Sequence, residues 1–276
     1  AVTTMSAPPS VAADTERAEA SSTNRDSGER WATVIVQLEE GGGDHASRYA
    51  DVKKRIGEAV AQASPGATIE DVRDYHHVFE GFAIKVPADT MAAIKGVQGV
   101  KGAFFEGRHE PVTDPDFWDM RDHSTDSSPD LGTASRMTGA AAASQRGQGQ
   151  VIEVIDVGVD TSHEAFAGSL DAASARLTRQ AMTSLAPSLG AGKDGAWVSD
   201  KIPFAYDYGD GDTDATTGNA SSRASEQGTH VASLATANGT SFTGAAPGAQ
   251  LVVAKVTSDD TYTAYDTALL AALDDA

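Results

Sequence analysis

The residues best suited to chemistry begin where a short apolar run ends in an acid. Val151-Ile-Glu-Val-Ile155 is followed by Asp156, and Gly158 lies two residues further on. Such a run predicts a strand of a parallel sheet that is covered on both faces. The carboxyl end of such a strand opens onto the crevice where ligands bind. Asp156 is therefore a candidate catalytic carboxylate, and the alternative is an ordinary Asp-x-Gly turn that ends a strand.

A second group of motifs follows in a fixed order. Gln227-Gly-Thr-His-Val-Ala232 precedes Ala245-Ala-Pro-Gly-Ala-Gln-Leu251. Together with Asp156-Val-Gly-Val-Asp160, this order and spacing resembles the subtilisin-like serine proteases (subtilases) from about residue 133 to residue 276. The segment 201–208 and the acidic loop after it resemble the cell-envelope branch of that family, the lactocepin and C5a-peptidase type. Residues 31–106, including Gly81-Phe-Ala83, resemble the inhibitor-like propeptide of the family.

The resemblance implies roles for individual residues. Asp156 would be the triad aspartate, which orients a histidine and stabilises its imidazolium form. The position of that histidine is held by Gln227. A glutamine amide has no basic site that titrates near neutral pH, so it cannot accept the proton of a nucleophile. His230 and His163 match other histidines of the family, which are not catalytic.

The resemblance also implies a nucleophilic serine in a segment like Gly-Thr-Ser-Met-Ala. No such segment occurs in this sequence. The chain as it stands is therefore predicted to be inactive by the usual triad. The main hypothesis is the amino-terminal part of a serine endopeptidase precursor. The alternative is a non-catalytic pseudoprotease that acts as a binding or scaffolding module. A third reading, that Gln227 was introduced or misread in an active enzyme, stays open.

The loop Asp210-Gly-Asp212-Thr-Asp214 has carboxylates at alternate positions, as oxygen-rich calcium loops do. In a chain this acidic, a solvated loop is the favoured alternative. Members of the family often bind calcium, so calcium remains a candidate ligand, and no cofactor is required for the expected chemistry.

The elements that must position these residues predict an α/β protein. Residues 133–276 would form the amino-terminal part of a doubly wound parallel-sheet subtilisin-like domain. Before it, strands at 31–38, 69–76, 81–86 and 100–105 and helices near 49–60 and 87–94 give the order β-α-β-β-α-β of a small α+β ferredoxin-like domain at 31–110. The resemblance implies that this domain is the propeptide, and the alternative is an unrelated domain with the same widely used order. Residues 106–110 would run along the substrate groove as an added strand.

The remaining segments complete the predicted domain organisation. Residues 1–30 are too polar to bury a core and are expected to be disordered. Residues 111–132 suit a linker in which processing would occur. Helices are expected at 134–143, 228–237 and 264–273, and a buried strand at 251–256. In the last helix, Leu269, Leu270 and Leu273 have the spacing of a core-facing side.

Composition limits the classes of function. The 276 residues carry a formal net charge of −19 and no cysteine. This charge argues against nucleic-acid binding, and no disulfide can form. No apolar run is long enough for a transmembrane helix. The resemblance to the subtilases implies that the partners are protein or peptide substrates and the propeptide itself, in a bacterial protein that is secreted or held at the cell envelope.

Overall fold

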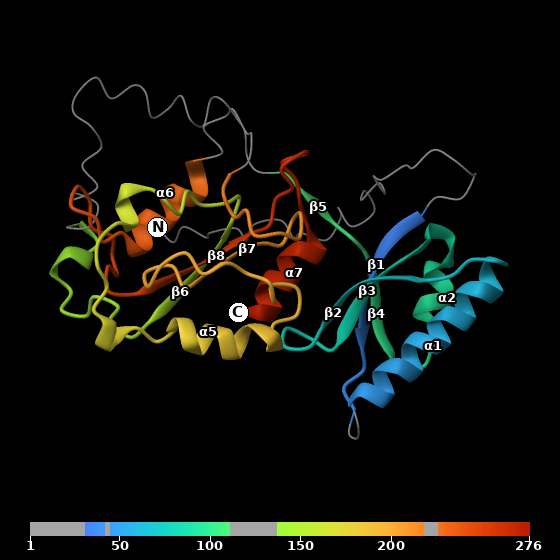
Figure 1. The fold of residues 1–276 in the computed structure, drawn as a ribbon. Helices are drawn as coiled ribbons and strands as arrows, with labels where there is room; N and C mark the ends of the chain where they lie inside the picture. The colour runs from blue at the N-terminus through green and yellow to red at the C-terminus, as the bar shows by residue number, and fades with distance from the viewer. Residues whose placement is uncertain (1–30, 42–44, 111–136, 218–225) are drawn as a thin grey trace, which may run out of the picture.

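The computed structural model describes residues 31–41, 45–110, 137–217 and 226–276, arranged around two sheets (Figure 1). The segments 1–30 and 111–132, predicted to be disordered and a linker, lie outside the described residues. Among the residues that are described, no helix has both the length and the apolar character needed to cross a bilayer.

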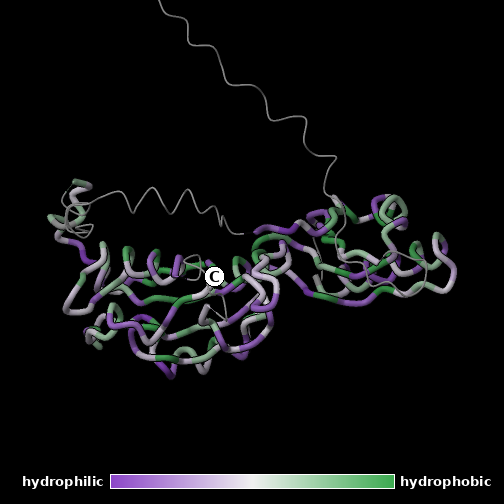
Figure 2. Tube along the Cα trace, turned by 90° about the horizontal axis from the view of Figure 1, so that it is seen from above, coloured by the Kyte–Doolittle hydropathy of each residue, from purple (hydrophilic) through white to green (hydrophobic). Residues whose placement is uncertain are grey.

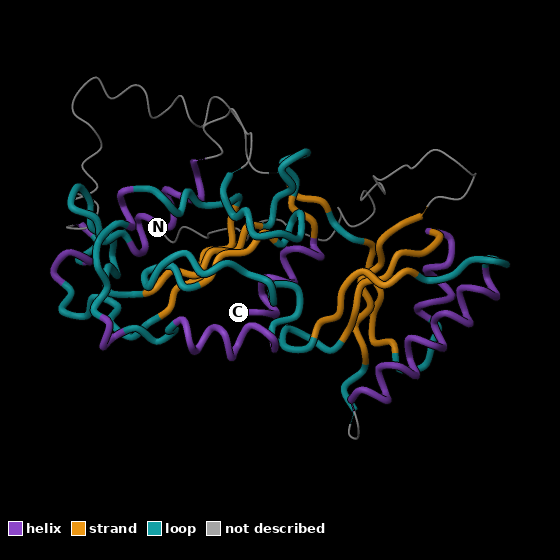
Figure 3. Tube along the Cα trace, in the orientation of Figure 1, coloured by secondary structure: helices purple, strands orange, loops and turns teal. Residues whose placement is uncertain are grey.

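The first sheet is antiparallel and has the strand order β2-β3-β1-β4. Its elements follow the predicted order β-α-β-β-α-β, and the helices α1 and α2 lie on one side of it (Figure 3). The elements are β1 (Trp31–Leu38), α1 (His45–Ala63), β2 (Glu70–Tyr75), β3 (Gly81–Pro87), the short 3-10 helix η1 (Ala88–Thr90), α2 (Met91–Lys95) and β4 (Val100–Phe105).

Alternation along the strands gives this sheet two apolar faces. Val34 and Val36 of β1 pack with Ile56 of α1 in one buried cluster. Ile35, which points the other way, joins a second cluster with Ala83 of β3 and residues of the following domain. The first sheet is therefore built to be covered on both sides.

The second sheet is parallel and has the order β6-β8-β7, as predicted for an α/β protein. Its strands are β6 (Val151–Asp156), β7 (Phe204–Asp207) and β8 (Gln250–Lys255). Helix α6 (Gln227–Thr236) packs through Ala232 on one face. Helices α5 (Arg179–Leu185) and α7 (Asp266–Asp275) share a cluster with the other face. The sheet is thus doubly wound.

Two of the predicted helices differ in the structure. Of the helix expected at 134–143, the residues before 137 lie outside the described part; Met137 is helical, Gly139 with φ 78° interrupts the helix, and a 3-10 turn follows at Ala140–Ala142. The last helix begins at Asp266 rather than Ala264, because Ala264–Tyr265 form the short strand β9. Leu273 was wrongly predicted to face the core: it is 49% exposed.

The sequence prediction did not include helix α5, because this helix falls in a polar stretch without clear periodicity. Its start has a local cause, since the Thr178 hydroxyl accepts a hydrogen bond from the Ala181 N–H over 3.1 Å. Leu269 and Leu270 pack against the core as predicted, although they are only partly buried, and the fully buried side of α7 is formed by alanines. Ala268, Ala271 and Ala272 share a buried cluster with Tyr75, Tyr206 and Tyr208.

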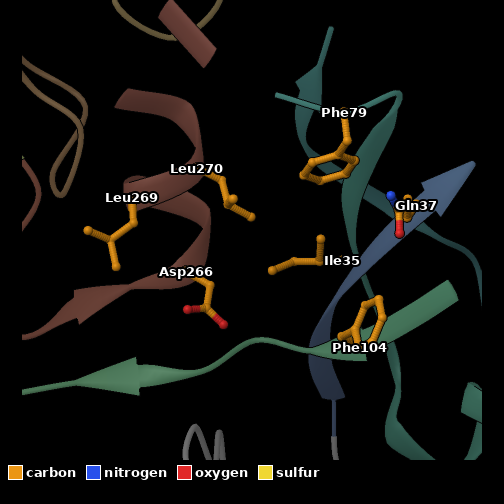
Figure 4. Close-up of a pocket in the computed structure, with 7 residues that line it drawn as sticks. All are labelled: Ile35, Gln37, Phe79, Phe104, Asp266, Leu269 and Leu270. Atoms are coloured by element: carbon orange, nitrogen blue, oxygen red, sulfur yellow. The ribbon is translucent and has the colours of Figure 1, made fainter. Parts of the chain in front are cut away.

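The two sheets meet over a narrow region (Figure 2). Ile35, Tyr75 and Ala83 of the first sheet share their cluster with the alanines of α7. The Arg73 guanidinium donates to the Tyr208 carbonyl over 2.8 Å. Residues of the first sheet and of α7 also line a cavity of about 460 Å³, formed by Ile35, Gln37, Phe79, Phe104, Asp266, Leu269 and Leu270 (Figure 4).

Asp274, near the end of α7, is a buried acid at the interface between the two sheets. Its buried carboxylate accepts hydrogen bonds from the backbone N–H groups of His76, His77 and Val78 at distances from 2.6 to 3.0 Å. Successive N–H groups of this kind make an anion-binding concavity. Asp274 therefore fixes the turn between β2 and β3 to the end of α7.

We expect Asp274→Asn to loosen the interface by about 1–3 kcal/mol, because the charge is lost and an amide N–H₂ faces N–H donors. Hydrogen–deuterium exchange of the amides at residues 76–78 measures the effect. Asp260→Asn, at an exposed acid, is the matched control. Equal exchange in the two variants would show that the carboxylate contributes nothing here.

Glu153 is a half-buried acid on the face of β6 opposite Val154. Burial, and then the negative charge of Asp275, raise its pKa from an ordinary 4.5 to about 7. Asp275 itself accepts from the N–H groups of Gly190 and Gly192 and from the Tyr208 hydroxyl. The Asp275 carboxylate is therefore held in place beside Glu153.

This raised pKa predicts that stability falls as the pH rises from about 4.5 to about 7. Over this window the unfolded chain ionises Glu153 while the folded protein keeps it protonated, so the stabilisation is full below 4.5 and lost by 7. We expect a loss of about 2 kcal/mol, after allowing for partial exposure. Urea unfolding of the wild-type chain and Glu153→Gln at pH 5, 6, 7 and 8 measures it, with Glu58→Gln as the exposed control. Parallel pH profiles would contradict the prediction.

Candidate active site

Asp156 lies at the carboxyl end of β6, where its half-buried side chain points to the same face as Val154, toward α6. The Val157 N–H donates to its Oδ1 over 2.7 Å. Burial raises the pKa of Asp156, and this hydrogen bond opposes the rise. The carboxylate is thus held in position at the end of the central parallel sheet.

Two glycines bring the start of α6 onto this carboxylate. Gly158 has φ 117°, and a Cβ there would lie 2.8 Å from the Thr216 carbonyl oxygen. A Cβ on Gly228 would overlap the Gly158 carbonyl oxygen and would lie 3.3 Å from the Cβ of Asp156. No larger residue fits either position without a shift of the backbone. The glycine pair therefore sets the first turn of α6 beside Asp156.

Gln227 is the first residue of α6 and the direct neighbour of Gly228. It is half-buried. The structure therefore places the glutamine in the helical turn that packs on Asp156. An amide at this place can donate and accept hydrogen bonds, but it cannot take up a proton near neutral pH.

His230, one turn further along α6, lies in different surroundings. It lines a cavity of about 550 Å³ together with Asp160, His163 and Glu164, and neither Asp156 nor Gln227 is among the described residues around that cavity. The Thr229 hydroxyl accepts from the Asp160 N–H over 2.9 Å and closes this side of the site. The position of His230 does not favour it as a substitute base.

Tyr262 is a residue near Asp156 that sequence reasoning missed. Its φ of 53° makes it the one non-glycine residue with positive φ among those described. Its hydroxyl is buried without a hydrogen-bond partner in the described part of the chain. Burial, and then the charge of Asp156, raise its pKa to about 12. No glycine or asparagine marks this turn in the sequence, so no local signal could have revealed it.

The loop that carries Tyr262 is followed by the short strand β9, and this strand pairs with an extended segment of the chain. Thr257 and Ala264 close the loop by an antiparallel bridge, and the Thr257 hydroxyl donates to the Val157 carbonyl over 3.3 Å. Strand β9 (Ala264–Tyr265) pairs antiparallel with β5 (Arg108–His109). A segment from the amino-terminal part of the chain thus lies as an added strand close to the turn after Asp156.

The acidic loop after β7 is organised around a lysine. The Lys255 ammonium lies 2.8 Å from Asp207 Oδ2 and also pairs with Asp259. Carboxylate oxygens of Asp207, Asp210 and Asp259 lie within 4.8 Å of one another. Because an ammonium group already neutralises two of these three acids, the cluster does not fit a calcium ion well.

Asp212 and Asp214, the other two candidate calcium ligands, accept hydrogen bonds from within the acidic loop. Asp212 Oδ1 accepts from the Asp214 N–H, and Asp214 Oδ1 accepts from the Thr216 N–H. The hydrogen bonds from Thr216 lower the pKa of Asp214. Asp210 accepts from the Asp259 N–H over 2.7 Å, so the structure brings Asp210 to the lysine cluster and leaves Asp212 and Asp214 outside it.

Comparison with known proteins fits this geometry. Residues 147–275 match the family model described as the subtilase family of peptidases. The PI-type proteinase of Lactococcus lactis subsp. cremoris is 27% identical over 83% of this chain and 12% of its own length. The minor extracellular protease Vpr of Bacillus subtilis is 26% identical over 89% of this chain and 28% of its own length.

A shorter match reaches the C5a peptidase of Streptococcus pyogenes serotype M6, which is 33% identical over 46% of this chain and 11% of its own length. The chain therefore spans about an eighth of the length of the PI-type and PIII-type proteinases, which match it over most of its residues. Within those limits, the match of residues 147–275 to the subtilase family and the matches to the PI-type proteinase and the C5a peptidase make this chain similar to subtilases of that branch.

Proposed function

We propose that this chain is the amino-terminal part of the precursor of a serine endopeptidase that is secreted or held at a bacterial cell envelope and acts on protein substrates. The observation that carries the proposal is Asp156 at a parallel-strand end, with the first turn of α6 packed onto it by Gly158 and Gly228. The name of Vpr, an extracellular protease, supports the location.

The chemistry would be acyl transfer through serine, histidine and aspartate. Asp156 would hold the base in the correct tautomer and stabilise it when protonated. Its fixed contact with the Val157 N–H and its half-buried position suit that role. No metal or organic cofactor is required for this reaction, and the serine would come from a part of the protein beyond this sequence.

Residues 31–110 would be an inhibitory propeptide with a ferredoxin-like arrangement. Three observations support this role: the strand order β2-β3-β1-β4, the packing of one sheet face on α7, and the pairing of β5 with β9. Lying along β9, the segment after β4 would occupy the place of a peptide substrate. Processing would then fall between residues 107 and 132.

A second candidate function rests on Gln227. A glutamine inside an otherwise intact motif favours a pseudoprotease that binds protein segments without cutting them. A histidine codon and a glutamine codon differ by one nucleotide, so an introduced change in an active enzyme is the third reading.

The test is self-cleavage in the longer precursor that joins this chain to the serine-bearing rest of a subtilase domain. Mass spectrometry maps cleavage within residues 107–132 in the Gln227 protein and in Gln227→His. Cleavage in the variant supports the endopeptidase, whereas a folded, uncut variant favours the binding module.

A further inference from the structure

The edge of β9 is paired with an extended segment, β5, and the carboxylate of Asp266 contacts that segment. Arg108 is in register with Tyr265, and His109 with Ala264. Asp266 follows at once as the first residue of α7, and its carboxylate is directed toward β5 (Figure 4). An acid in the first turn of a helix is stabilised by the free N–H groups there, which holds it in place.

Asp266 contacts both the backbone and a side chain of this segment. The Gly107 N–H donates to its Oδ2 over 2.7 Å. The His109 Nε2 lies 2.7 Å from its Oδ1. The backbone of residue 107 and the side chain of residue 109 thus reach the two oxygens of the same carboxylate. Docking of the backbone therefore places the side chain of residue 109 against Asp266.

The charges around this contact favour a cation. On the receiving segment 257–267 the charged side chains are Asp259, Asp260 and Asp266, all acidic. Asp259 is already paired with Lys255. The neighbouring Arg108 is occupied by Glu110 at 2.6 Å. Asp266 is the acid of this segment whose carboxylate contacts the side chain of residue 109, and Glu106, beside Thr267, adds a further negative charge nearby, in a chain whose formal net charge is −19.

We propose that Asp266 is a specificity-determining residue, which selects extended peptides with a cationic side chain (imidazolium, ammonium or guanidinium) at the position that pairs with Ala264. This inference rests on the proposed function, which makes the β9 edge the place of the substrate. Opposite charge at hydrogen-bond distance steers partner choice, and an acidic side chain at the same position is repelled.

The segment 106–110 of the 276-residue chain serves as its own probe. His109→Lys, His109→Gln and His109→Glu are compared by hydrogen–deuterium exchange of residues 106–110 and 263–267 at pH 7. We expect His109→Lys to be at least as protected as the wild type. His109→Glu should exchange roughly fivefold faster than His109→Lys, the size expected for a partly exposed charge pair.

The same three changes in an Asp266→Asn background give the decisive control, because asparagine keeps an oxygen for the Gly107 N–H. In that background, the difference in exchange between His109→Lys and His109→Glu should fall below about twofold. If the difference persists there, or is absent when Asp266 is present, the proposal is overturned. Asp266→Ser is the second background in case Asp266→Asn unfolds. The readout needs no peptide hydrolysis, so its failure is distinct from an uncut Gln227→His precursor.

Discussion

Replacing Gln227 by histidine is expected to raise the rate of self-cleavage by about 10⁴-fold or more in a precursor that also carries the serine. The reason is that the imidazole can accept the proton of the nucleophile and return it to the leaving amine, whereas the amide of glutamine can do neither. A time course of cleavage within residues 107–132, followed by mass spectrometry, gives the rate.

The site should accept this change without rearrangement. The contact of Gly228 with Gly158 and Asp156 fixes the first turn of α6 independently of the side chain at 227. A histidine at 227 would therefore start beside the carboxylate that is needed to orient it. Asp156 lies in a half-buried position, where such an interaction is weakened less by water than at the surface.

Two matched variants test whether the gain comes from a base. Gln227→Asn keeps an amide and should stay at the level of the glutamine protein. Gln227→His combined with Asp156→Asn should lose about 10⁴-fold of the gain, because the imidazole would be held in the wrong tautomer. Equal rates with and without Asp156 would show that the restored histidine does not work with this carboxylate.

The parts of the site that could be predicted from sequence are those with local causes. A short apolar run ending in Asp156 encodes a buried parallel strand, and Gly158 and Gly228 encode close backbone approach. Each signal is contained in a few adjacent residues. The parallel sheet and the place of Asp156 at the end of β6 follow from them.

The parts that were missed depend on distant contacts. Tyr262 adopts its positive φ between two threonines, where only the surrounding loop can impose it. Leu273 has the spacing of a core residue, yet α7 turns its alanines inward because bulky tyrosines already fill that side. The pairing of His109 with Asp266 joins residues 157 positions apart. Periodicity cannot report such partners.

The lysine cluster also depends on distant contacts, and the parallel register explains it. Lys255 is in register with Asp156 on one side and with Asp207 on the other, so three charged residues stand side by side at the strand ends. Its ammonium pairs with Asp207 and Asp259. Burial alone would lower the pKa of Lys255, but the hydrogen bonds to these two acids outweigh it and raise the pKa.

Lys255→Met is therefore expected to destabilise the chain by about 3–5 kcal/mol, because it leaves Asp207, which is fully buried, without its counter-charge. The two N–H groups that also reach Asp207, from Gly209 and Asp210, cannot replace a full positive charge. Urea unfolding at pH 7 measures the loss. Lys54→Met, at an exposed pair with Glu58, should change stability by less than about 0.5 kcal/mol.

The double variant Lys255→Met with Asp207→Leu separates the cost of an unpaired charge from the worth of the pair. Removing both charges abolishes the buried anion, so most of the loss should be recovered, as for buried ion pairs replaced by apolar residues of similar volume. A double variant as unstable as Lys255→Met would mean that packing of the lysine stem, rather than charge, is what the strand ends need. A loss below about 1 kcal/mol in the single variant would mean that Asp207 takes up a proton readily and that the lysine is dispensable.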